Sequence, residues 1–396
     1  MKALNDNAHP LESLLQQHCP NGVEFKELGE LWEKAPKSKM GANQAKNLSK
    51  DNGNICFTSG ETHYFIDDYL VDGEFLFLND GGTADIKYNS GKAYYTDHIF
   101  AFTSQKICVK FLYYFLKDKQ EEINKTCFQG TGLKNLQKNK IEKFPIPLPP
   151  LEIQYKIVEI LDTFTELQVE LEAELEARLK QYHYYRNKLL SHDELENRTA
   201  KSRNDSDPTP IVPYVRLGEV CEKVFAGGDL PKEYSKDKKP SGEFLYPIYS
   251  NGSDENSLYG FSKTYRIDAE AVTISARGTI GFHTTREAKF TPIVRLITLI
   301  PNLNKITNRF LNYALYTTHI EKYGTSAGIP QLTIPMLEKI TIPLPPLSVQ
   351  EEIVELLDKF DTLANDLSAG LPAEIEARKK QYEYYRERLL SFIAKD

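Results

Sequence analysis

Polar and basic side chains gather around glycine-rich turns in the C-terminal half of the chain. The richest stretch, residues 274–290, reads ISARGTIGFHTTREAKF, and a second polar turn occupies residues 249–252. Arginine and asparagine can form paired hydrogen bonds with the edges of guanine and adenine, whereas lysine neutralises phosphates. The chemistry suggested is nucleic-acid contact. The candidate contact residues of this half are Lys238, Tyr249, Ser250, Asn251, Lys263, Arg277, Thr279, His283 and Arg286.

A comparable set lies in the N-terminal half, in a stretch rich in Gly, Asn and Ser and in the turns that follow it. Its members are Lys37, Lys39, Lys46, Thr58, Ser59, Asn79, Thr83 and Lys87. This half contains no arginine before residue 150, so that guanine contacts there would fall to Lys, Asn, Gln or Ser. For each single residue the alternative is an ordinary solvated surface loop. The collective pattern favours nucleic-acid contact over that alternative.

Motifs for catalysis are missing from the sequence. It contains no P-loop G-x-x-x-x-G-K-[ST], no G-x-S-x-G, no H-E-x-x-H and no amino-methyltransferase D/N-P-P-Y pattern. The eight histidines have no metal-ligand spacing, and the five cysteines form no C-x-x-C pair. Asp268 with Glu287-Ala288-Lys289 matches a nuclease D…E-x-K pattern only loosely and has no counterpart in the other half. We therefore expect no catalytic residue, metal or cofactor on this chain.

The chain repeats itself at a long period. Residues 146–164 read IPLPPLEIQYKIVEILDTF and residues 342–360 read IPLPPLSVQEEIVELLDKF, at an offset of 196. Residues 176–191 (EARLKQYHYYRNKLLS) match residues 376–391 (EARKKQYEYYRERLLS) at an offset of 200. Because this period is far too long for a solenoid, two copies indicate a pseudo-twofold molecule.

The repeated block predicts a long amphipathic helix from Glu152 to Ser191, because apolar residues recur in steps of three and four. Such a helix is about 60 Å long at 1.5 Å per residue, which suits a coiled coil better than a solitary helix on a globular core. In the second copy Gly370 and Pro372 should break or kink the helix. The helices are acidic, since residues 151–200 hold 11 acidic and 6 basic side chains, and they are better suited as spacers or partner surfaces than as DNA contacts. The candidate partner contacts are Tyr182, Tyr185, Leu189, Tyr382, Tyr385 and Leu389.

The bodies before each helix alternate short aromatic and β-branched runs with Gly, Asn and Ser turns, which predicts strands. The runs are residues 54–58, 74–78, 94–102, 244–249, 271–275 and 293–300, and helical patterns cover residues 106–117 and 304–323. We expect an α/β (α+β) fold with two globular domains related by a pseudo-twofold repeat and two long coiled-coil helices. The expected divisions are residues 1–145 and 214–341 for the domains, 146–191 and 342–396 for the helices, and 192–213 for a linker.

Composition is ordinary for a folded protein of two or three domains. The 396 residues include 49 Lys and Arg against 56 Asp and Glu, a net charge of −7, which excludes a uniformly basic nucleic-acid coat. No apolar stretch has the length of a membrane span, and the first twenty residues show no apolar signal-peptide core. The scattered cysteines fit a reducing compartment, so we expect a cytoplasmic protein.

The ordered set of motifs resembles the specificity subunit of type I restriction–modification enzymes. Each diverged body begins with V-x-x-x-x-L-G-E and is followed by I-P-L-P-P-L and a helix ending Q-Y-x-Y-Y-R-x-x-L-L-S. The resemblance implies two target-recognition domains, each reading one half of a bipartite DNA site in the major groove. It also implies two conserved antiparallel helices whose length sets the spacer between half-sites. The doubled ELEA at residues 170–177 is similar to the tetrapeptide repeats that this family varies.

The resemblance further implies partners and an absence of catalysis on this chain. Two methyltransferase subunits would dock on the helices, and two restriction (translocase) subunits would join them. Those partners would use S-adenosylmethionine, ATP and magnesium. The alternatives are an orphan subunit that directs methylation without restriction, a coiled-coil adaptor without DNA specificity, and a self-contained nuclease or methyltransferase.

Overall fold

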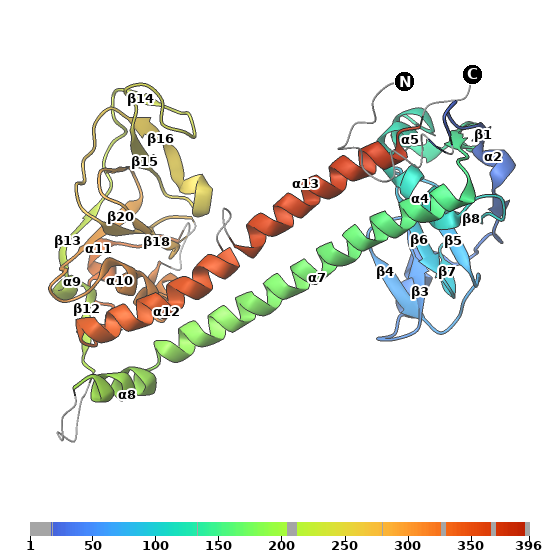
Figure 1. Ribbon diagram of the computed structural model, residues 1–396. Coiled ribbons are helices and arrows are strands. Elements are labelled where there is room, and N and C mark those ends of the chain that lie inside the picture. The colour runs from blue at the N-terminus through green and yellow to red at the C-terminus, as the bar shows by residue number, and fades with distance from the viewer. Residues whose placement is uncertain are drawn as a thin grey trace. The chain divides into compact units, whose positions relative to one another are not determined.

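A computed structural model describes residues 17, 19–132, 134–203, 212–278, 280–325, 330–365 and 370–392. The chain divides into two compact units (Figure 1). Unit 1 consists of Met1–Glu172 and Glu374–Asp396, and unit 2 is Ala173–Ala373. Both boundaries lie within the repeated helical blocks, so that each half of the sequence contributes to both units.

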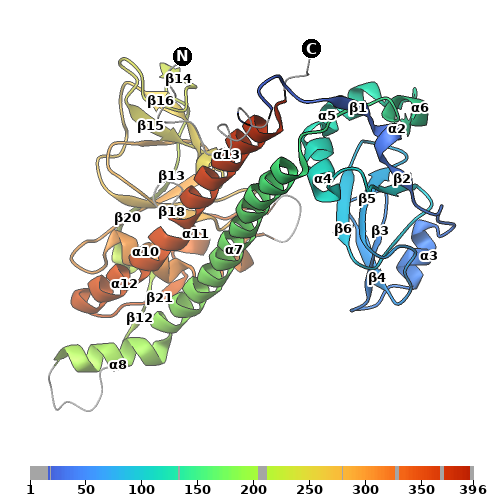
Figure 2. The ribbon, with the colours of Figure 1, turned by 45° about the vertical axis from the view of Figure 1, so that its right-hand side comes forward.

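Unit 1 is built on two small sheets and a cluster of helices. One sheet has the order β2-β8-β5-β6 and is antiparallel, and the other has the order β4-β3-β7 with β3 and β7 parallel. Helix α4 packs against β5 and β6 (Figure 2). The elements are β1 (Phe25–Glu27), α2 (Leu28–Leu31), β2 (Glu33–Lys34), α3 (Ala42–Asn47), β3 (Asn54–Phe57), β4 (His63–Ile66), β5 (Glu74–Asn79), β6 (Ile86–Ser90), β7 (Ala93–Tyr95), β8 (Ile99–Thr103), α4 (Val109–Asp118), α5 (Gln120–Thr126), β9 (Phe128–Gln129), β10 (Asn135–Leu136), α6 (Lys138–Ile141) and β11 (Pro145–Pro147).

Unit 2 repeats this plan in its two sheets. They have the orders β13-β20-β17-β18 and β14-β16-β15-β19, again with one parallel pair, β15 and β19. Helix α10 packs on β17 and β18 as α4 packs on β5 and β6. The elements are β12 (Tyr214–Arg216), α9 (Leu217–Val220), β13 (Cys221–Ala226), β14 (Tyr234–Ser235), β15 (Tyr246–Tyr249), η1 (Asp254–Ser257), β16 (Leu258–Ser262), β17 (Ala271–Ser275), β18 (His283–Arg286), β19 (Thr291–Pro292), β20 (Leu296–Pro301), α10 (Asn308–Leu315), η2 (Ile320–Tyr323), α11 (Ile334–Leu337) and β21 (Thr341–Pro343).

The predicted helices are present, with an interruption in the second copy. Helix α7 (Leu151–Leu189) is continuous over 39 residues. The second copy is split into α12 (Leu347–Asn365) and α13 (Leu371–Leu390), with Pro372 in the first turn of α13. The interruption predicted from Gly370 and Pro372 is thus confirmed, since proline is tolerated only in a first turn.

Three sequence predictions need correction. Residues 94–102 form two strands, because a turn at Asp97 and His98 separates β7 from β8, with the Ile99 N–H donating to the Thr96 carbonyl at 3.1 Å. The helix predicted over residues 304–323 closes after Leu315 and restarts as η2, because His319 has a φ of 50°. The linker predicted over residues 192–213 contains helix α8 (His192–Arg203), which packs on α12 with Leu195 buried.

Each unit pairs a repeated block from one half of the sequence with a block from the other half. In unit 1 the ring of Phe164 stacks on Tyr385, with centroids 5.4 Å apart, and Lys379 pairs with Glu172 at 3.4 Å. In unit 2 the ring of Phe360 stacks on Tyr185 at 5.1 Å. Phe164 corresponds to Phe360 and Tyr185 to Tyr385 in the repeats, so that one contact is made twice.

A buried glutamine in each unit joins the repeated helix to its body. The Oε1 atom of Gln154 accepts from the Cys108 N–H at 2.8 Å, and its Nε2 donates to the Pro149 carbonyl at 2.7 Å. Gln350 accepts from the Thr307 N–H and donates to the carbonyls of Lys305 and Pro345, each at 2.9 Å. Because Cys108 and Thr307 precede α4 and α10, each glutamine also satisfies a free N–H at a helix start.

A carboxylate two turns further along strengthens the same junction. Asp162 accepts from Lys110 Nζ at 2.7 Å and from the Tyr114 hydroxyl at 2.6 Å. Asp358 accepts from the Tyr313 hydroxyl at 2.6 Å and from Arg309. Burial and the neighbouring carboxylate raise the pKa of both tyrosines, which therefore stay neutral donors.

Replacing Gln350 with alanine should destabilise unit 2 by roughly 2–4 kcal/mol, because it leaves the Thr307 N–H and the carbonyls of Lys305 and Pro345 without this partner. Urea unfolding followed by circular dichroism measures this. The matched control is Gln168→Ala on α7, whose side chain donates only to Glu172 and should change stability by less than about 0.5 kcal/mol. Equal stability of the two variants would contradict the role given to Gln350.

Candidate nucleic-acid interface

In unit 1 four of the predicted contact residues lie together at the end of β5. The Asn79 side chain donates to the carbonyls of Ser59 at 2.8 Å and Thr83 at 3.3 Å. Its Oδ1 accepts from Lys87 Nζ at 3.2 Å. Asn79 is itself only 3 % exposed, so it supports this surface through its hydrogen bonds rather than by direct contact. Thr83 is exposed.

The other predicted contact residues of unit 1 are either buried or exposed to solvent. Thr58 is buried, and its hydroxyl donates to the Thr62 carbonyl and accepts from the Gly60 N–H, which removes it as a direct contact. Lys37, Lys39 and Lys46 are exposed and form no ion pair with the described residues. These three lysines remain suited to phosphate contact.

In unit 2 the side chain of Asn251 ties two loops together. Its Oδ1 accepts from the N–H groups of Ala276 at 2.7 Å and Arg277 at 3.1 Å, and its Nδ2 donates to the Arg277 carbonyl. The neighbouring Ser250 N–H donates to the Ser257 carbonyl at 2.8 Å. The polar turn after β15 and the loop after β17 are therefore joined to each other.

Arg286 of β18 and Tyr249 of β15 join the two sheets of unit 2. The guanidinium of Arg286 covers the Tyr249 ring at 3.7 Å and donates to the hydroxyls of Thr273 at 3.1 Å and Ser257 at 2.8 Å. Burial lowers the pKa of this guanidinium. Arg286 is thus committed to internal bonds that support the surface.

His283 is another correction to the predicted contacts. It is 6 % exposed, and its Nδ1 lies 2.9 Å from Asn312 Oδ1. Its ring meets Tyr316 edge-on at 4.4 Å, and burial lowers its pKa, so that a neutral imidazole belongs to the core. The sequence placed it on a polar loop because it stands among Thr and Arg, whereas alternation along β18 turns it inward.

Two lysines of unit 2 have partners within the unit. Lys238 donates to the Leu258 carbonyl at 2.6 Å. Lys263 pairs with Glu233 at 3.0 Å and Glu243 at 2.8 Å on the surface, which weakens its case as a phosphate contact. The predicted contact Thr279 lies outside the described residues.

The predicted partner contacts are engaged within the chain itself. Tyr182 and Leu189 belong to the core of unit 2, Leu389 to the core of unit 1, and Tyr382 and Tyr385 pack against that core. Tyr185 stacks on Phe360. The exposed aromatic residues that both copies of the repeat share are instead Tyr184, 61 % exposed, and Tyr384, 51 % exposed. Tyr184 and Tyr384 are equivalent in the two repeats, 200 residues apart, so the sequence repeat could have identified them.

Sequence reasoning also missed Arg295. It is exposed, and it sits in the turn between β19 and β20 with a φ of 70°. Only a few per cent of non-glycine residues adopt a positive φ. The apolar neighbours of Arg295 in the sequence gave no hint of a surface turn.

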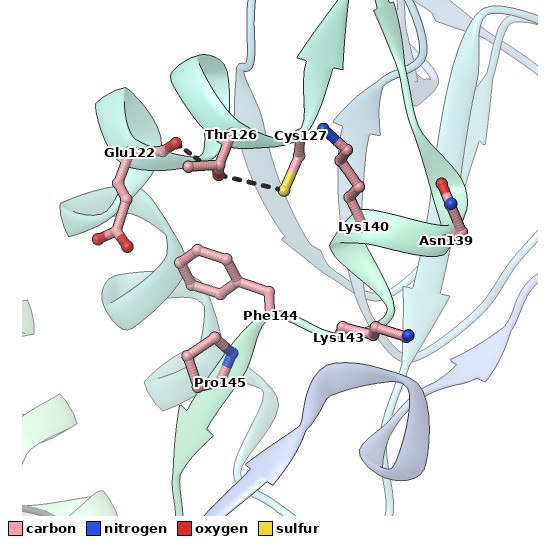
Figure 3. Close-up of a pocket in the computed structure, with 8 residues that line it drawn as sticks. All are labelled: Glu122, Thr126, Cys127, Asn139, Lys140, Lys143, Phe144 and Pro145. Atoms are coloured by element: carbon pink, nitrogen blue, oxygen red, sulfur yellow. Dashed lines mark hydrogen bonds between the residues drawn. The ribbon is translucent and has the colours of Figure 1, made fainter.

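A cavity in unit 1 lies apart from the predicted contact residues. Its volume is about 490 Å³, and it is lined by eight residues from α5 to β11, none of them among the predicted contacts (Figure 3). Burial raises the pKa of its Cys127 thiol. Within the described part of the chain, no group of three or more His, Cys, Asp or Glu residues could hold a metal, and no helix could span a membrane.

Comparison with known proteins gives one consistent family. The profile of the type I restriction modification DNA specificity domain matches twice, over residues 20–181 and 212–377. A Mycoplasma pneumoniae protein named as a type I specificity subunit is 36 % identical over 341 residues, which cover 82 % of this chain and 96 % of the relative. A Haemophilus influenzae type I restriction enzyme specificity subunit is 32 % identical over 98 % of this chain and all of the relative.

The fold matches as well. The crystal structure of the type I restriction–modification S subunit from M. genitalium aligns over 99 % of both chains, with a TM-score of 0.66 and 20 % identity. The two profile matches cover both bodies, and they end inside α7 and α13. The resemblance inferred from the sequence motifs is confirmed, and the chain belongs to the family of type I restriction–modification specificity subunits.

Proposed function

We propose that unit 1 and unit 2 each read one half of a bipartite DNA site, and that the chain directs partner subunits to that site. The observation that supports this is the pair of bodies with one shared strand plan and different side chains at the strand ends. The shared plan explains how both would approach DNA in the same manner. The differing side chains, such as Gly81 in one and Arg277 in the other, explain how the half-sites would differ.

The chemistry would belong to the partners. We infer two methyltransferase subunits that use S-adenosylmethionine and two restriction (translocase) subunits that use ATP and magnesium, with this chain as a non-catalytic subunit in the cytoplasm. In support, the sequence motifs for these cofactors are missing here. A solved structure that concerns complex assembly of a type I restriction–modification system contains a chain that matches this one at a TM-score of 0.51.

The repeated helices offer a matched pair of docking points for two identical partners. Tyr184 and Tyr384 occupy equivalent places in the two copies and are more than half exposed. Each ring meets the next tyrosine edge-on, Tyr184 with Tyr185 at 5.3 Å and Tyr384 with Tyr385 at 5.4 Å. A preordered, exposed aromatic ring loses little entropy on docking, and tyrosine is common among the residues that dominate binding energy. We assign methyltransferase docking to this pair.

The function is tested by modified-base sequencing of host DNA with the gene intact and deleted. We expect methylated adenine at one bipartite motif, two short half-sites around a fixed gap, to disappear on deletion. An unchanged methylation pattern, together with failure to co-purify any methyltransferase, would overturn the proposal in favour of a protein-binding adaptor. Methylation without restriction would identify an orphan subunit.

Deleting one ELEA, residues 170–173, should shorten the recognised spacer without changing either half-site. Helix α7 runs unbroken through the doublet, and the boundary between the units falls inside it at Glu172. Four residues correspond to about 6 Å of helix, or about two base pairs at 3.4 Å each. The measurement is the methylated motif of the variant, and a changed half-site with an unchanged spacer contradicts the prediction.

The control for this deletion replaces Glu170 and Glu172 with alanine. This keeps the helix length and removes two acidic side chains, so the spacer should be the same as in the wild type. A shortened spacer in the control would show that charge, not length, sets the gap.

The double variant Tyr184→Ala, Tyr384→Ala should bind the methyltransferase at least about tenfold more weakly, because two equivalent aromatic anchors are removed. Affinity is measured by titrating the purified methyltransferase subunit, with circular dichroism to verify folding. The control is Tyr155→Ala on α7, which is 60 % exposed but whose counterpart in the second copy is Glu351. Wild-type affinity in the double variant would exclude this docking point.

A further inference from the structure

The backbone at the strand ends of the two bodies makes the same hydrogen bonds in both units, and we call this shared arrangement the frame. In unit 1 the Asp80 N–H donates to the His98 carbonyl at 2.9 Å, and in unit 2 the Ala276 N–H donates to the Arg295 carbonyl at 3.0 Å. The residue before β8 and the residue before β20 therefore occupy equivalent positions. These residues are His98 in unit 1 and Arg295 in unit 2.

A third segment completes the frame in both units. Leu136 donates its N–H to the Asp80 carbonyl at 3.0 Å, and Leu332 donates to the Ala276 carbonyl at 2.9 Å. Isolated bridges join Gly81 to Asn135 and Arg277 to Gln331, and both pairs are related by the 196-residue offset. Gly81 and Arg277 are thus equivalent.

Two arginines in unit 2 replace a glycine and a histidine in unit 1 at these equivalent places. Arg277 is half-buried and Arg295 is exposed. Neither guanidinium has a hydrogen bond, ion pair or ring contact with the described residues, whereas Arg266, Arg286 and Arg309 of the same unit are all bonded. Within the described part of the chain, two uncompensated guanidinium groups therefore stand on adjoining backbone segments.

The backbone at Arg295 is strained, and the loop that contains Arg277 is fixed by hydrogen bonds with the side chain of Asn251. A non-glycine residue in the left-handed region costs of order 1 kcal/mol or more, and such residues cluster at functional sites. Asn251 binds both the N–H and the carbonyl of Arg277. Both polar atoms of the Asn251 side chain are used in these bonds. Asn251 therefore fixes the path of the backbone as it leaves β17.

We propose that Arg277 and Arg295 form the guanine-reading element of unit 2 and that Asn251 is its positioning residue. This inference rests on the proposed function. Arginine presents two parallel N–H donors that match O6 and N7 of guanine in the major groove. Phosphates are the same along all DNA, so a phosphate contact would give no reason for the two bodies to differ at one shared position. Because the frame is common and only the side chains differ, base reading accounts for the difference.

The test uses the complete complex with its methyltransferase partners, acting on a DNA library in which both half-sites are randomised. The variants are Arg277→Ala, Arg277→Lys and Arg295→Gly. Each should relax the preference for guanine in one half-site by at least about tenfold and leave the other half-site unchanged. Lysine keeps the charge but lacks the paired donors, so Arg277→Lys separates base reading from phosphate contact.

The Arg295→Gly variant separates loss of DNA contact from loss of folding. Glycine accepts the positive φ without strain, so the melting temperature should not fall. The matched control is Lys289→Gly, which relieves the same kind of strain (φ of 68°). The pairing of Ala271 with Arg286 places Lys289 near the opposite end of β17 from Arg277. This control should leave both half-sites unchanged.

Asn251→Ala should relax the same guanine position as Arg277→Ala. A merely structural role would instead lower methylation at all sites equally. His98→Ala provides the internal comparison, because any change it causes should fall in the half-site read by unit 1.

Two results would overturn the inference while leaving the proposed function intact. One is an unchanged motif in Arg277→Lys or in Arg295→Gly. The other is a uniform loss of methylation across all sequences with a weaker salt dependence, which would identify phosphate contacts. A wild-type complex that methylates no bipartite site would overturn the proposed function and this inference together.

Discussion

Stacking of a phenylalanine from one repeated block on a tyrosine from the other is the contact on which both units depend. Phe164 with Tyr385 and Phe360 with Tyr185 are the same pair made twice, each between the two halves of the sequence. Because of this exchange, each half of the sequence contributes residues to the core around the other half's body. The core of unit 1 contains Leu389 and Leu390 from the C-terminus, and the core of unit 2 contains Tyr182 and Leu189 from the first half. A twofold repeat in the sequence thus becomes a twofold repeat in packing.

Polar contacts then set the position of each body on its helix. Gln154 and Gln350 are buried and bonded to the starts of α4 and α10. Asp162 and Asp358 hold tyrosine hydroxyls of the same two helices. Since a buried polar group without its partner is costly, these bonds favour one placement of helix on body over others. Precise placement matters in a protein proposed to hold reading surfaces at a defined separation.

The surface at the strand ends combines a common frame with different side chains. Hydrogen bonds from Asp80 to His98 and from Ala276 to Arg295 are equivalent, whereas the side chains at those positions differ in size and charge. A backbone frame held by its own hydrogen bonds tolerates such changes, because the exposed side chains contribute little to folding. This separation between frame and surface allows a body to change what it contacts while its fold persists.

Much of the architecture was predictable from the sequence alone. Repeats at offsets of 196 and 200 residues, helical periodicity and the I-P-L-P-P-L blocks identified two bodies, a continuous α7 and an interrupted second helix. These features depend on local spacing and on proline and glycine, whose backbone effects do not require knowledge of distant residues. The polar turns that contain Asn79 and Asn251 were also visible in the sequence, although their contacts with other loops were not.

Only the tertiary structure decided which side chain faces outward. His283 stands among polar residues in the sequence but turns into the core, because β18 packs one face on α10. Tyr182 and Tyr185 are covered by residues from the other half of the sequence, so that Tyr184 is the ring left exposed. Arg295 joins Arg277 only because β20 pairs with β17. Burial and proximity of this kind arise from contacts between distant residues, and a local sequence pattern contains no information about them.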